Sequence, residues 1–533
     1  GRPGLGLRRA GVEVARAHAL RALGRAEAAL EAALAACRAR LDARDGLVGE
    51  DAPALLRRTR DAGDLAVELA LGALAAGVPP GRVARAALDA AEAGRALSLL
   101  EGVVHRDALL AAHVPAALRE GEATARAALD AARRRRLDAA ATPAPDDDAA
   151  ADRALAEAYR AHAEAADRVG REARAVAATV FPHPADADAV AATLAPDEAA
   201  IVLHVGAERA TAVVVRPGRT AAPVLCDLGP GRPLVEAADA WRRAASAPGS
   251  DDRALASALH ARVVAPMRAA LAGARRWVVA PDAVVATAPF AAMLDATGPT
   301  PRRLVEDVEV VLVPSLTFFA AQRADRTPPG TGVLALGGPA FRADGPDALP
   351  PLPGARAEAE AVAAAWPADD RTVLVGSDAT EARLRAALAD GRRRALVHVA
   401  THAFADAGFP RLTHLALAGD DAWDLDEIQA TPVRADVVVL SACATATGTT
   451  LQGEGVVGLA RSFLLAGARR VVASAWAVDD GATRPLMERF AAGLASGDGA
   501  AAALRAAQRA ALATGGPGAH PSRWAAFAVW GAP

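Results

Sequence analysis

The hydrophobic and polar positions divide the chain into two halves with different periods. From residue 1 to about residue 175, apolar residues recur every three or four positions, with few β-branched runs between them. This spacing places the apolar residues on one face of a helix. It predicts helices over residues 11–41, 53–77, 79–103 and 121–136, with a further helix over roughly 152–178. The N-terminal half is therefore expected to be all-α.

The pattern changes after Pro184. Two short β-type runs, Ile201–Gly206 and Ala210–Val215, are separated by Ala-Glu-Arg and predict a hairpin. Further strands are predicted at Trp277–Ala280 and Val308–Val313. From Gly332 onward, strands at 332–337, 372–375, 396–400, 436–441 and 470–475 alternate with helices at 354–366, 379–389, 454–466, 481–495 and 499–513. Continuous apolar strands between helices predict a mostly parallel sheet covered on both faces, which is an α/β fold.

The N-terminal helices resemble degenerate tetratricopeptide repeats. Leu23–Arg25 joins two helical stretches, and Ala91–Ala96 resembles the helix that often closes such arrays. A strict period of about 34 residues is not evident, so an irregular helical bundle is the alternative. We expect tetratricopeptide-like repeats over 1–130, then a charged linker and a connecting helix over 131–185.

Composition narrows the class of protein. The 533 residues exceed one ordinary domain. All 60 basic residues are Arg, Lys and Asn are absent, and the formal net charge is −3. This charge gives no global attraction to nucleic acid or to an anionic membrane. No apolar stretch reaches the roughly 18 residues that a membrane-spanning helix needs, and no signal peptide is visible. We therefore expect a cytoplasmic protein that contacts neither membrane nor nucleic acid.

Candidate chemistry lies just beyond two of the predicted strands. His402 follows the strand at 396–400, and Cys443 follows the strand at 436–441. If these strands are parallel neighbours, both residues lie on the same edge of the sheet, where reactive groups of open α/β sheets gather. A thiol beside an imidazole is the minimal nucleophilic pair. The alternative is that Cys443 is a small buried residue of the core.

The other residues with reactive side chains are expected to be structural. His398 falls within a buried strand, and Cys37 and Cys226 are far apart in sequence, so we interpret all three as packing residues. No set of ligands has the spacing of a zinc site, and no Walker-type phosphate loop is present. The sequence therefore predicts neither a metal ion nor an organic cofactor.

The segments around these two residues resemble the CHAT domain of bacteria, which is related to the caspase and separase cysteine peptidases. The matching motifs are Val397–His402, Val439–Thr445, Gly453–Gly455, Gly458–Arg461, Ala466–Arg469, Trp476–Asp480 and Pro521–Phe527. Upstream, the same likeness covers Pro281–Asp282, Ala288–Ala291, Val313–Ser315 and Leu352–Ala355 ahead of Glu358. The resemblance spans about 250–533. In this family, helical repeats usually precede the domain in the same chain.

The resemblance implies a role for each site residue. Cys443 would be the nucleophile, His402 the general base, and the backbone N–H groups of Ala403 and Cys443 the oxyanion hole. Relatives usually carry Gly at the position of Ala403, an acidic residue or Gln at the position of Ala444, and Gly at the position of Ala446, so this sequence departs from the pattern at three positions.

A substrate pocket is the remaining expectation for the site. Asp480 matches the acidic residue that faces a basic substrate side chain in separase-like relatives. With Trp476 as an apolar wall, it would form part of the P1 pocket. The alternative is that Asp480 only caps the helix that starts near Ala482.

The predicted function is a cysteine endopeptidase that hydrolyses protein substrates, regulated by a protein partner on the helical repeats. Residues 190–325 would form a noncatalytic caspase-like subdomain and residues 326–533 the catalytic one. A catalytically weak or inactive CHAT scaffold that acts as an interaction module is the alternative. Acyl transfer with the same dyad is a third reading that the sequence does not separate from hydrolysis.

Overall fold

The computed structural model describes most of the 533-residue chain. The described residues are 3–43, 52–103, 116–141, 150, 152–165, 168, 184–206, 208–218, 221–342, 348–404, 414–441, 450–451, 455–456, 459–476 and 480–533.

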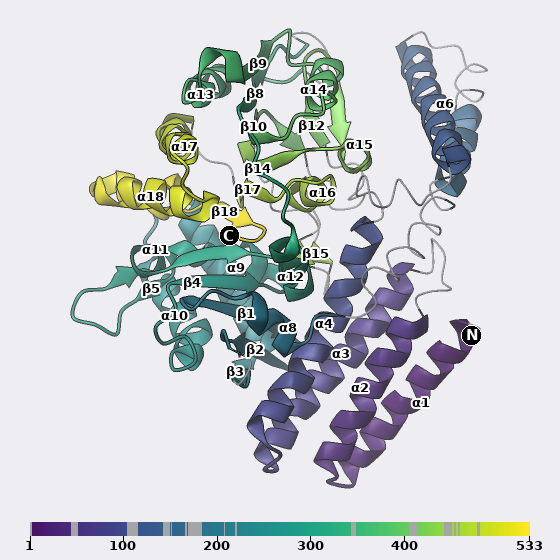
Figure 1. Ribbon diagram of the computed structural model, residues 1–533, viewed down its shortest axis with the longest axis vertical. Coiled ribbons are helices and arrows are strands. Elements are labelled where there is room, and N and C mark those ends of the chain that lie inside the picture. The colour runs from purple at the N-terminus through teal and green to yellow at the C-terminus, as the bar shows by residue number, and fades with distance from the viewer. Residues whose placement is uncertain are drawn as a thin grey trace.

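The N-terminal half is helical, as predicted. Its helices are α1 (Pro3–Ala22), α2 (Ala26–Ala43), α3 (Ala52–Ala75), α4 (Pro80–Val103) and α6 (Ala116–Ala141). Helices α1 to α4 pack side by side, and α6 stands apart from them (Figure 1). The stretch predicted at 11–41 is two helices, joined at Gly24, whose φ of 70° suits a residue without a Cβ. Most of the buried residues between these helices are Ala, which lets the helices approach closely.

The C-terminal half contains one sheet of 11 strands in the order β3-β2-β1-β4-β7-β18-β17-β14-β10-β8-β9. The strands are β1 (Glu198–Val205), β2 (Arg209–Val215), β3 (Val224–Pro230), β4 (Arg276–Ala280), β7 (Glu309–Leu312), β8 (Val333–Pro339), β9 (Arg371–Gly376), β10 (Arg394–Ala400), β14 (Ala435–Ser441), β17 (Arg470–Ser474) and β18 (Phe527–Trp530). Only β1–β2, β2–β3 and β17–β18 pair antiparallel. The prediction of a mostly parallel sheet is confirmed.

Two pairs and one trio of short strands lie outside the main sheet in the described part of the chain. They are β5 (Leu294–Asp295) with β6 (Arg302–Arg303), β11 (Ala403–Phe404) with β12 (His414–Ala416) and β13 (Ala422–Asp424), and β15 (Thr450–Leu451) with β16 (Gly455–Val456). The last pair changes one predicted boundary. Because Gly455 and Val456 pair with β15, the helix predicted over 454–466 begins only at Leu459.

Helices cover both faces of the sheet. They are α8 (Ala187–Thr193), α9 (Gly231–Ser246), α10 (Arg253–Val263), α11 (Leu304–Asp307), α12 (Leu316–Ala324), α13 (Pro353–Ala363), α14 (Glu381–Leu388), α15 (Leu425–Ala430), α16 (Leu459–Leu465), α17 (Asp480–Ala495) and α18 (Ala500–Ala513). Around β8, β10, β14 and β17, helices α13, α17 and α18 lie on one side, and α14, α15 and α16 lie on the other (Figure 1). The strands between them are therefore shielded from water on both faces, which explains their continuous apolar character.

The last strand, β18, joins the two predicted caspase-like subdomains. It lies between β7, which belongs to the 190–325 region, and β17, which belongs to the 326–533 region. Val529 pairs with Val311 on one side and with Val472 on the other. Both regions therefore share one continuous sheet, and the division at about residue 325 stays a prediction.

Two buried charges on α4 attach the helical half to the sheet half. The Glu92 carboxylate accepts hydrogen bonds from Leu316 N (3.1 Å), Thr317 N (2.9 Å) and Thr317 Oγ1 (2.8 Å), which are the first residues of α12. Arg95, one turn later, donates to the carbonyls of Leu203 and Pro281. Both side chains are buried, at 0% and 3% exposure. A buried charge is tolerated only when it is well paired, so these contacts fix α4 on the sheet half.

Candidate active site

The register of the sheet brings the two predicted catalytic segments to the same edge. Strand β10 pairs parallel with β14, and Ala400 is opposite Ser441. His402 comes two residues after Ala400, and Cys443 comes two residues after Ser441. Cys443 itself lies outside the described residues, so its distance from His402 stays untested. What the described residues define is the imidazole and its surroundings.

The imidazole of His402 is held by a backbone carbonyl. Its Nε2 lies 3.0 Å from the carbonyl oxygen of Pro350, in the segment that precedes α13. A carbonyl oxygen only accepts hydrogen bonds, so Nε2 is the protonated nitrogen. In the neutral ring, Nδ1 then carries the lone pair. A base with this tautomer accepts a proton at Nδ1 while the Pro350 carbonyl stabilises the resulting imidazolium.

Aromatic rings flank His402. Phe341, just beyond β8, has its ring centroid 5.2 Å from that of the imidazole, and Phe404 of β11 lies at 6.3 Å. Phe404 in turn stacks on His414 at 5.1 Å and is 39% exposed. The imidazole therefore has two apolar rings next to it, and one of them, Phe404, is partly exposed to solvent.

The backbone at Ala403 has the conformation of a strand. Ala403 is opposite Leu415 in the β11–β12 pair, and the neighbouring Ala416 N–H donates to His402 O at 2.9 Å. In an antiparallel ladder, hydrogen-bonded and non-hydrogen-bonded pairs alternate, so Ala403 and Leu415 form a non-hydrogen-bonded pair. The Ala403 N–H therefore points away from β12. Because this backbone is extended, Ala replaces Gly here without strain.

Trp476 and Asp480 follow β17, two strands away from β10. Trp476 is buried at 6% exposure, and its Nε1 donates to the carbonyl of Ser522 at 3.4 Å. Asp480 is the first residue of α17, and its side chain lies outside the described part of the structure. Because α17 begins at Asp480 and not near Ala482, Asp480 lies in the first turn, where a carboxylate favours the helix N-terminus, and the position is also compatible with a pocket residue.

Two of the other described histidines contact polar groups of the fold. His398, inside β10, is fully buried, and its Nε2 lies 2.9 Å from Oε1 of Glu358. His520 contacts Ser522 Oγ at 2.8 Å and the carbonyl of Ser250 at 3.0 Å.

The two described cysteines are poor nucleophiles. Cys37 and Cys226 are free and buried. Burial raises the pKa of Cys37 to about 12 and also raises the pKa of Cys226. Since the thiolate is the reactive form, neither thiol is suited to attack a substrate at neutral pH.

Sequence reasoning missed Pro350, Phe341 and Phe404. Each lies beyond the carboxyl end of a strand or beside a recognised motif, so position alone could have marked them. Their residue types carry no reactive group, and a backbone carbonyl leaves no signature in the sequence. The interaction with His402 appears only when the chain is folded.

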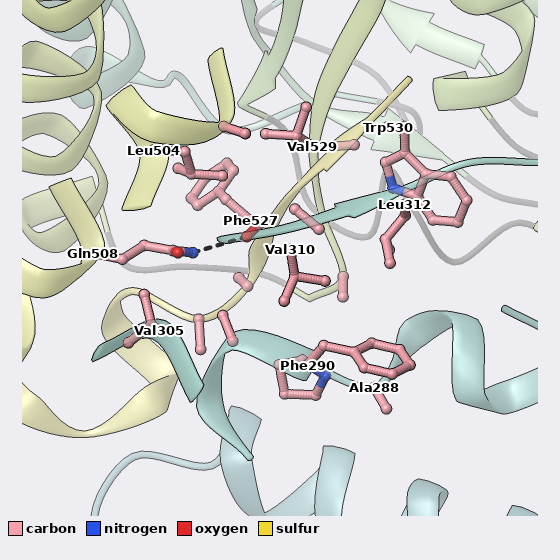
Figure 2. A pocket seen from close by; sticks show the side chains of 18 of the residues that line it. Ala288, Phe290, Val305, Val310, Leu312, Leu504, Gln508, Phe527, Val529 and Trp530 are labelled. Carbon is pink, nitrogen blue, oxygen red and sulfur yellow. Dashed lines mark hydrogen bonds between the residues drawn. The ribbon is translucent and has the colours of Figure 1, made fainter. Parts of the chain in front are cut away.

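Two of the cavities lined by described residues contain neither Cys nor His. One, of about 40 Å³, lies between β7, β17, β18 and α18 and is lined mainly by apolar side chains (Figure 2). Gln508 at its wall donates to the carbonyl of Phe527 at 2.9 Å. The other, of about 260 Å³, is lined by Gln322, Arg323, Asp325, Arg326, Thr327, Arg469, Arg470, Ala532 and Pro533. Neither includes His402.

Comparison with known proteins places these features in a family. The CHAT domain family model matches residues 253–532, which is more than half of the chain. Among curated proteins, tetratricopeptide repeat protein 28 of Homo sapiens is 34% identical over 122 residues, and that of Mus musculus is 33% identical over 122 residues. Each match covers 23% of this chain and only 5% of the relative.

Two solved structures of the Saccharomyces cerevisiae separase–securin complex are distant neighbours. The first has a TM-score of 0.49 at 10% identity and covers 95% of this chain and 37% of that chain. The second has a TM-score of 0.42 at 9% identity and covers 91% and 38%. Within the described residues, no helix is both long and apolar enough to cross a membrane.

Proposed function

The chain belongs to the CHAT domain family, and on this premise we propose that it is a cysteine endopeptidase of the caspase and separase class that cleaves protein substrates with a Cys443–His402 dyad. The observation that carries the proposal is the hydrogen bond between His402 Nε2 and the Pro350 carbonyl, which leaves Nδ1 as the basic nitrogen. The parallel register of β10 and β14 supports the choice of Cys443 as its partner.

The proposed reaction uses the groups at this edge of the sheet. Nδ1 of His402 takes the proton of the Cys443 thiol, and the thiolate attacks the carbonyl carbon of the scissile peptide bond. The backbone N–H groups of Ala403 and Cys443 hold the oxyanion. His402 then returns the proton to the leaving amine, and water hydrolyses the thioester that remains. The Pro350 carbonyl keeps the imidazole oriented through both steps.

The specificity of the peptidase belongs to the same proposal. Asp480, at the start of α17, would pair with an Arg or Lys side chain at P1, with Trp476 as part of the apolar wall. The buried position of Trp476 is consistent with a role in shaping that wall rather than in contacting solvent. Peptide libraries test this proposal. If D480A cleaves with the same P1 preference as the unmodified chain, Asp480 has only a structural role at the start of α17.

The helical half would carry the regulator. Arrays of helices present extended surfaces that bind proteins. Arg95 on α4 donates to the carbonyl of Pro281, and Pro281 is followed closely by the 3-10 helix η4 (Ala283–Thr287). This helix packs against the β15–β16 hairpin, which follows Cys443 in the chain. A displacement of α4 by a bound partner could therefore be transmitted through Pro281 and η4 to the hairpin that follows Cys443.

A peptide probe with an electrophile that traps thiols tests the enzyme proposal. We expect covalent labelling at Cys443 in the full chain, loss of labelling in C443A, and at least about a hundredfold slower labelling in H402A because the general base is removed. H18A is the matched control, since His18 is exposed on α1, and it should label like the unmodified chain. Equal labelling of H402A and the unmodified chain would falsify the dyad.

The alternative is a CHAT scaffold in which the fold transmits binding without catalysis. The specific observation in its favour is the presence of Ala403 and Ala444 at positions where relatives carry other residues. The same probe separates the two functions, because an inert Cys443 in the presence of candidate partner proteins supports the scaffold.

A further inference from the structure

Two separate contacts tie the segment 350–358 to the strand that leads to His402. The first joins the Pro350 carbonyl to His402 Nε2 at 3.0 Å. The second joins Glu358 Oε1 to His398 Nε2 at 2.9 Å. Pro350 precedes α13 and Glu358 lies within it, while His398 lies in β10 and His402 follows two residues beyond its end. The buried pair and the contact to the catalytic imidazole therefore link the same two pieces of chain.

The buried Glu358–His398 pair can restrict the position of α13 relative to β10. The side chains of His398 and Glu358 are 0% and 4% exposed. Water does not compete for such a pair, and a buried ionisable group that loses its partner is strongly destabilised. The two atoms lie within ion-pair distance but outside hydrogen-bond geometry, so the pair limits how far α13 can move from β10 without forming a directed bond between them.

The close approach of α13 to β8 explains why this position matters. A Cβ at Gly337 would lie 2.3 Å from the carbonyl oxygen of Ala355 and 2.6 Å from the Cβ of Ala359. At Gly338, whose φ is +54°, an added Cβ would lie 2.8 Å from the carbonyl oxygen of Leu352. Helix α13 therefore rests directly on the backbone of β8, with no side chain between them to absorb a shift. A displacement of the helix is transmitted to Leu352 and Pro350 at its N-terminus.

We propose that Glu358 is a positioning residue for the dyad: through His398 it fixes α13 against β10, and so holds the Pro350 carbonyl that orients His402. Glu358 touches no reacting atom. Its role is to keep α13, and with it the Pro350 carbonyl, at a fixed position relative to β10. This inference rests on the proposed function, because it assigns Glu358 to the geometry of that same site.

Side-chain length distinguishes positioning from a purely electrostatic role. E358D keeps the charge but shortens the reach by one methylene, so α13 must move or the contact to His398 must break. E358Q keeps the length and an oxygen acceptor but removes the charge. Positioning therefore predicts that E358D is the more harmful change, and an electrostatic role predicts that E358Q is. E360D is the matched control, because Glu360 lies exposed on the same helix and, among the described residues, pairs with Arg356 alone at 3.0 Å.

The readout is the rate at which iodoacetamide alkylates Cys443 in the full chain, followed by peptide mass mapping from pH 5 to 9. No peptidase turnover is needed, and Cys37 and Cys226 react slowly because burial raises the pKa of each thiol. We expect E358D to slow alkylation at neutral pH about tenfold, because a displaced imidazole takes the proton of the Cys443 thiol less readily. E358Q and E360D should stay within about twofold of the unmodified chain, and all three should retain the native circular dichroism spectrum.

The outcomes separate this inference from the proposed function. If H402A alkylates like the unmodified chain, the dyad itself is wrong. If H402A slows the reaction but E358D does not, or if E358Q slows it as much as E358D, the dyad stands and the positioning role of Glu358 is overturned.

Discussion

Single residues control the protonation states on which the chemistry depends. At His402, the contact with a carbonyl oxygen selects the tautomer, because that oxygen has no proton to donate. At Cys37 and Cys226, burial keeps the thiols protonated, so the two described cysteines are held out of competition with Cys443. The local environment of each group, rather than its residue type, decides what it can do.

Glu427 gives a pH-dependent prediction at the same scale. It forms a reciprocal capping pair with Asp424, in which Glu427 N donates to Asp424 Oδ1 at 2.8 Å and Asp424 N donates to Glu427 Oε2 at 3.0 Å. Burial, with further contributions from Asp424 and Glu381, raises the pKa of Glu427 from 4.5 to about 7. The folded state therefore binds this proton more tightly than the unfolded chain does. The resulting stability is present below pH 4.5 and is lost as the pH rises through about 7.

E427Q should remove this dependence, because Gln keeps the capping hydrogen bond and does not ionise. Urea unfolding at intervals between pH 5 and 8 measures the free energy of unfolding of both proteins. The value for E427Q should increase relative to that of the unmodified chain as the pH rises. E236Q is the control, since Glu236 is exposed on α9 and its one ion pair within the described part of the chain is with Arg232. A constant difference between E427Q and the unmodified chain over this range would contradict the raised pKa.

At the scale of elements, the contact between α13 and β8 is the one that shapes the site. G337A places a methyl group against the Ala355 carbonyl and Ala359, so the helix must move away from the strand. We expect a loss of roughly 1–3 kcal/mol of stability, as for other overpacked cores. Since α13 carries Pro350 with it, Cys443 alkylation should slow as well.

G72A is the matched control for this element. Gly72 lies in α3 with no neighbour within 4 Å of an added Cβ, and Ala favours the helix. Thermal unfolding followed by circular dichroism measures both variants. If the melting temperature of G337A equals or exceeds that of G72A, the direct packing of α13 on the backbone of β8 is contradicted.

At the scale of the whole molecule, α4 is the link between the repeats and the sheet. R95L removes the hydrogen bonds that Arg95 donates to the carbonyls of Leu203 and Pro281, and removes a charge 3.8 Å from Asp282. We expect the free energy of unfolding to fall by about 3–5 kcal/mol, as when one partner of a buried pair is removed. Calorimetry should also show the helical half melting before the sheet half.

R82L tests the same helix without the buried contacts. Arg82 is exposed and pairs with Glu27 and Glu31 on α2, so its loss should cost less than about 1 kcal/mol. If R95L and R82L melt alike and each in one transition, α4 does not couple the two halves.

Much of this architecture follows from the sequence, for a local reason. Helix and strand periods are set within a few turns or residues, so the all-α half, the α/β half and the strands before His402 and Cys443 were predictable from spacing alone. The helix at 454–466 was misplaced at its start because Gly455 and Val456 pair with β15 instead. A two-residue pairing is too short to leave a periodic signal.

The sequence by itself determined which residues carry reactive groups and that two of them follow strands, while the structure decided that these strands are parallel neighbours. Only the tertiary structure decided that β18 lies between β7 and β17, that Pro350 meets His402 across 52 residues of chain, and that Glu358 meets His398. These contacts join segments whose local patterns are independent of one another. They exist because the whole sheet packs in one order, and no window of the sequence contains both partners.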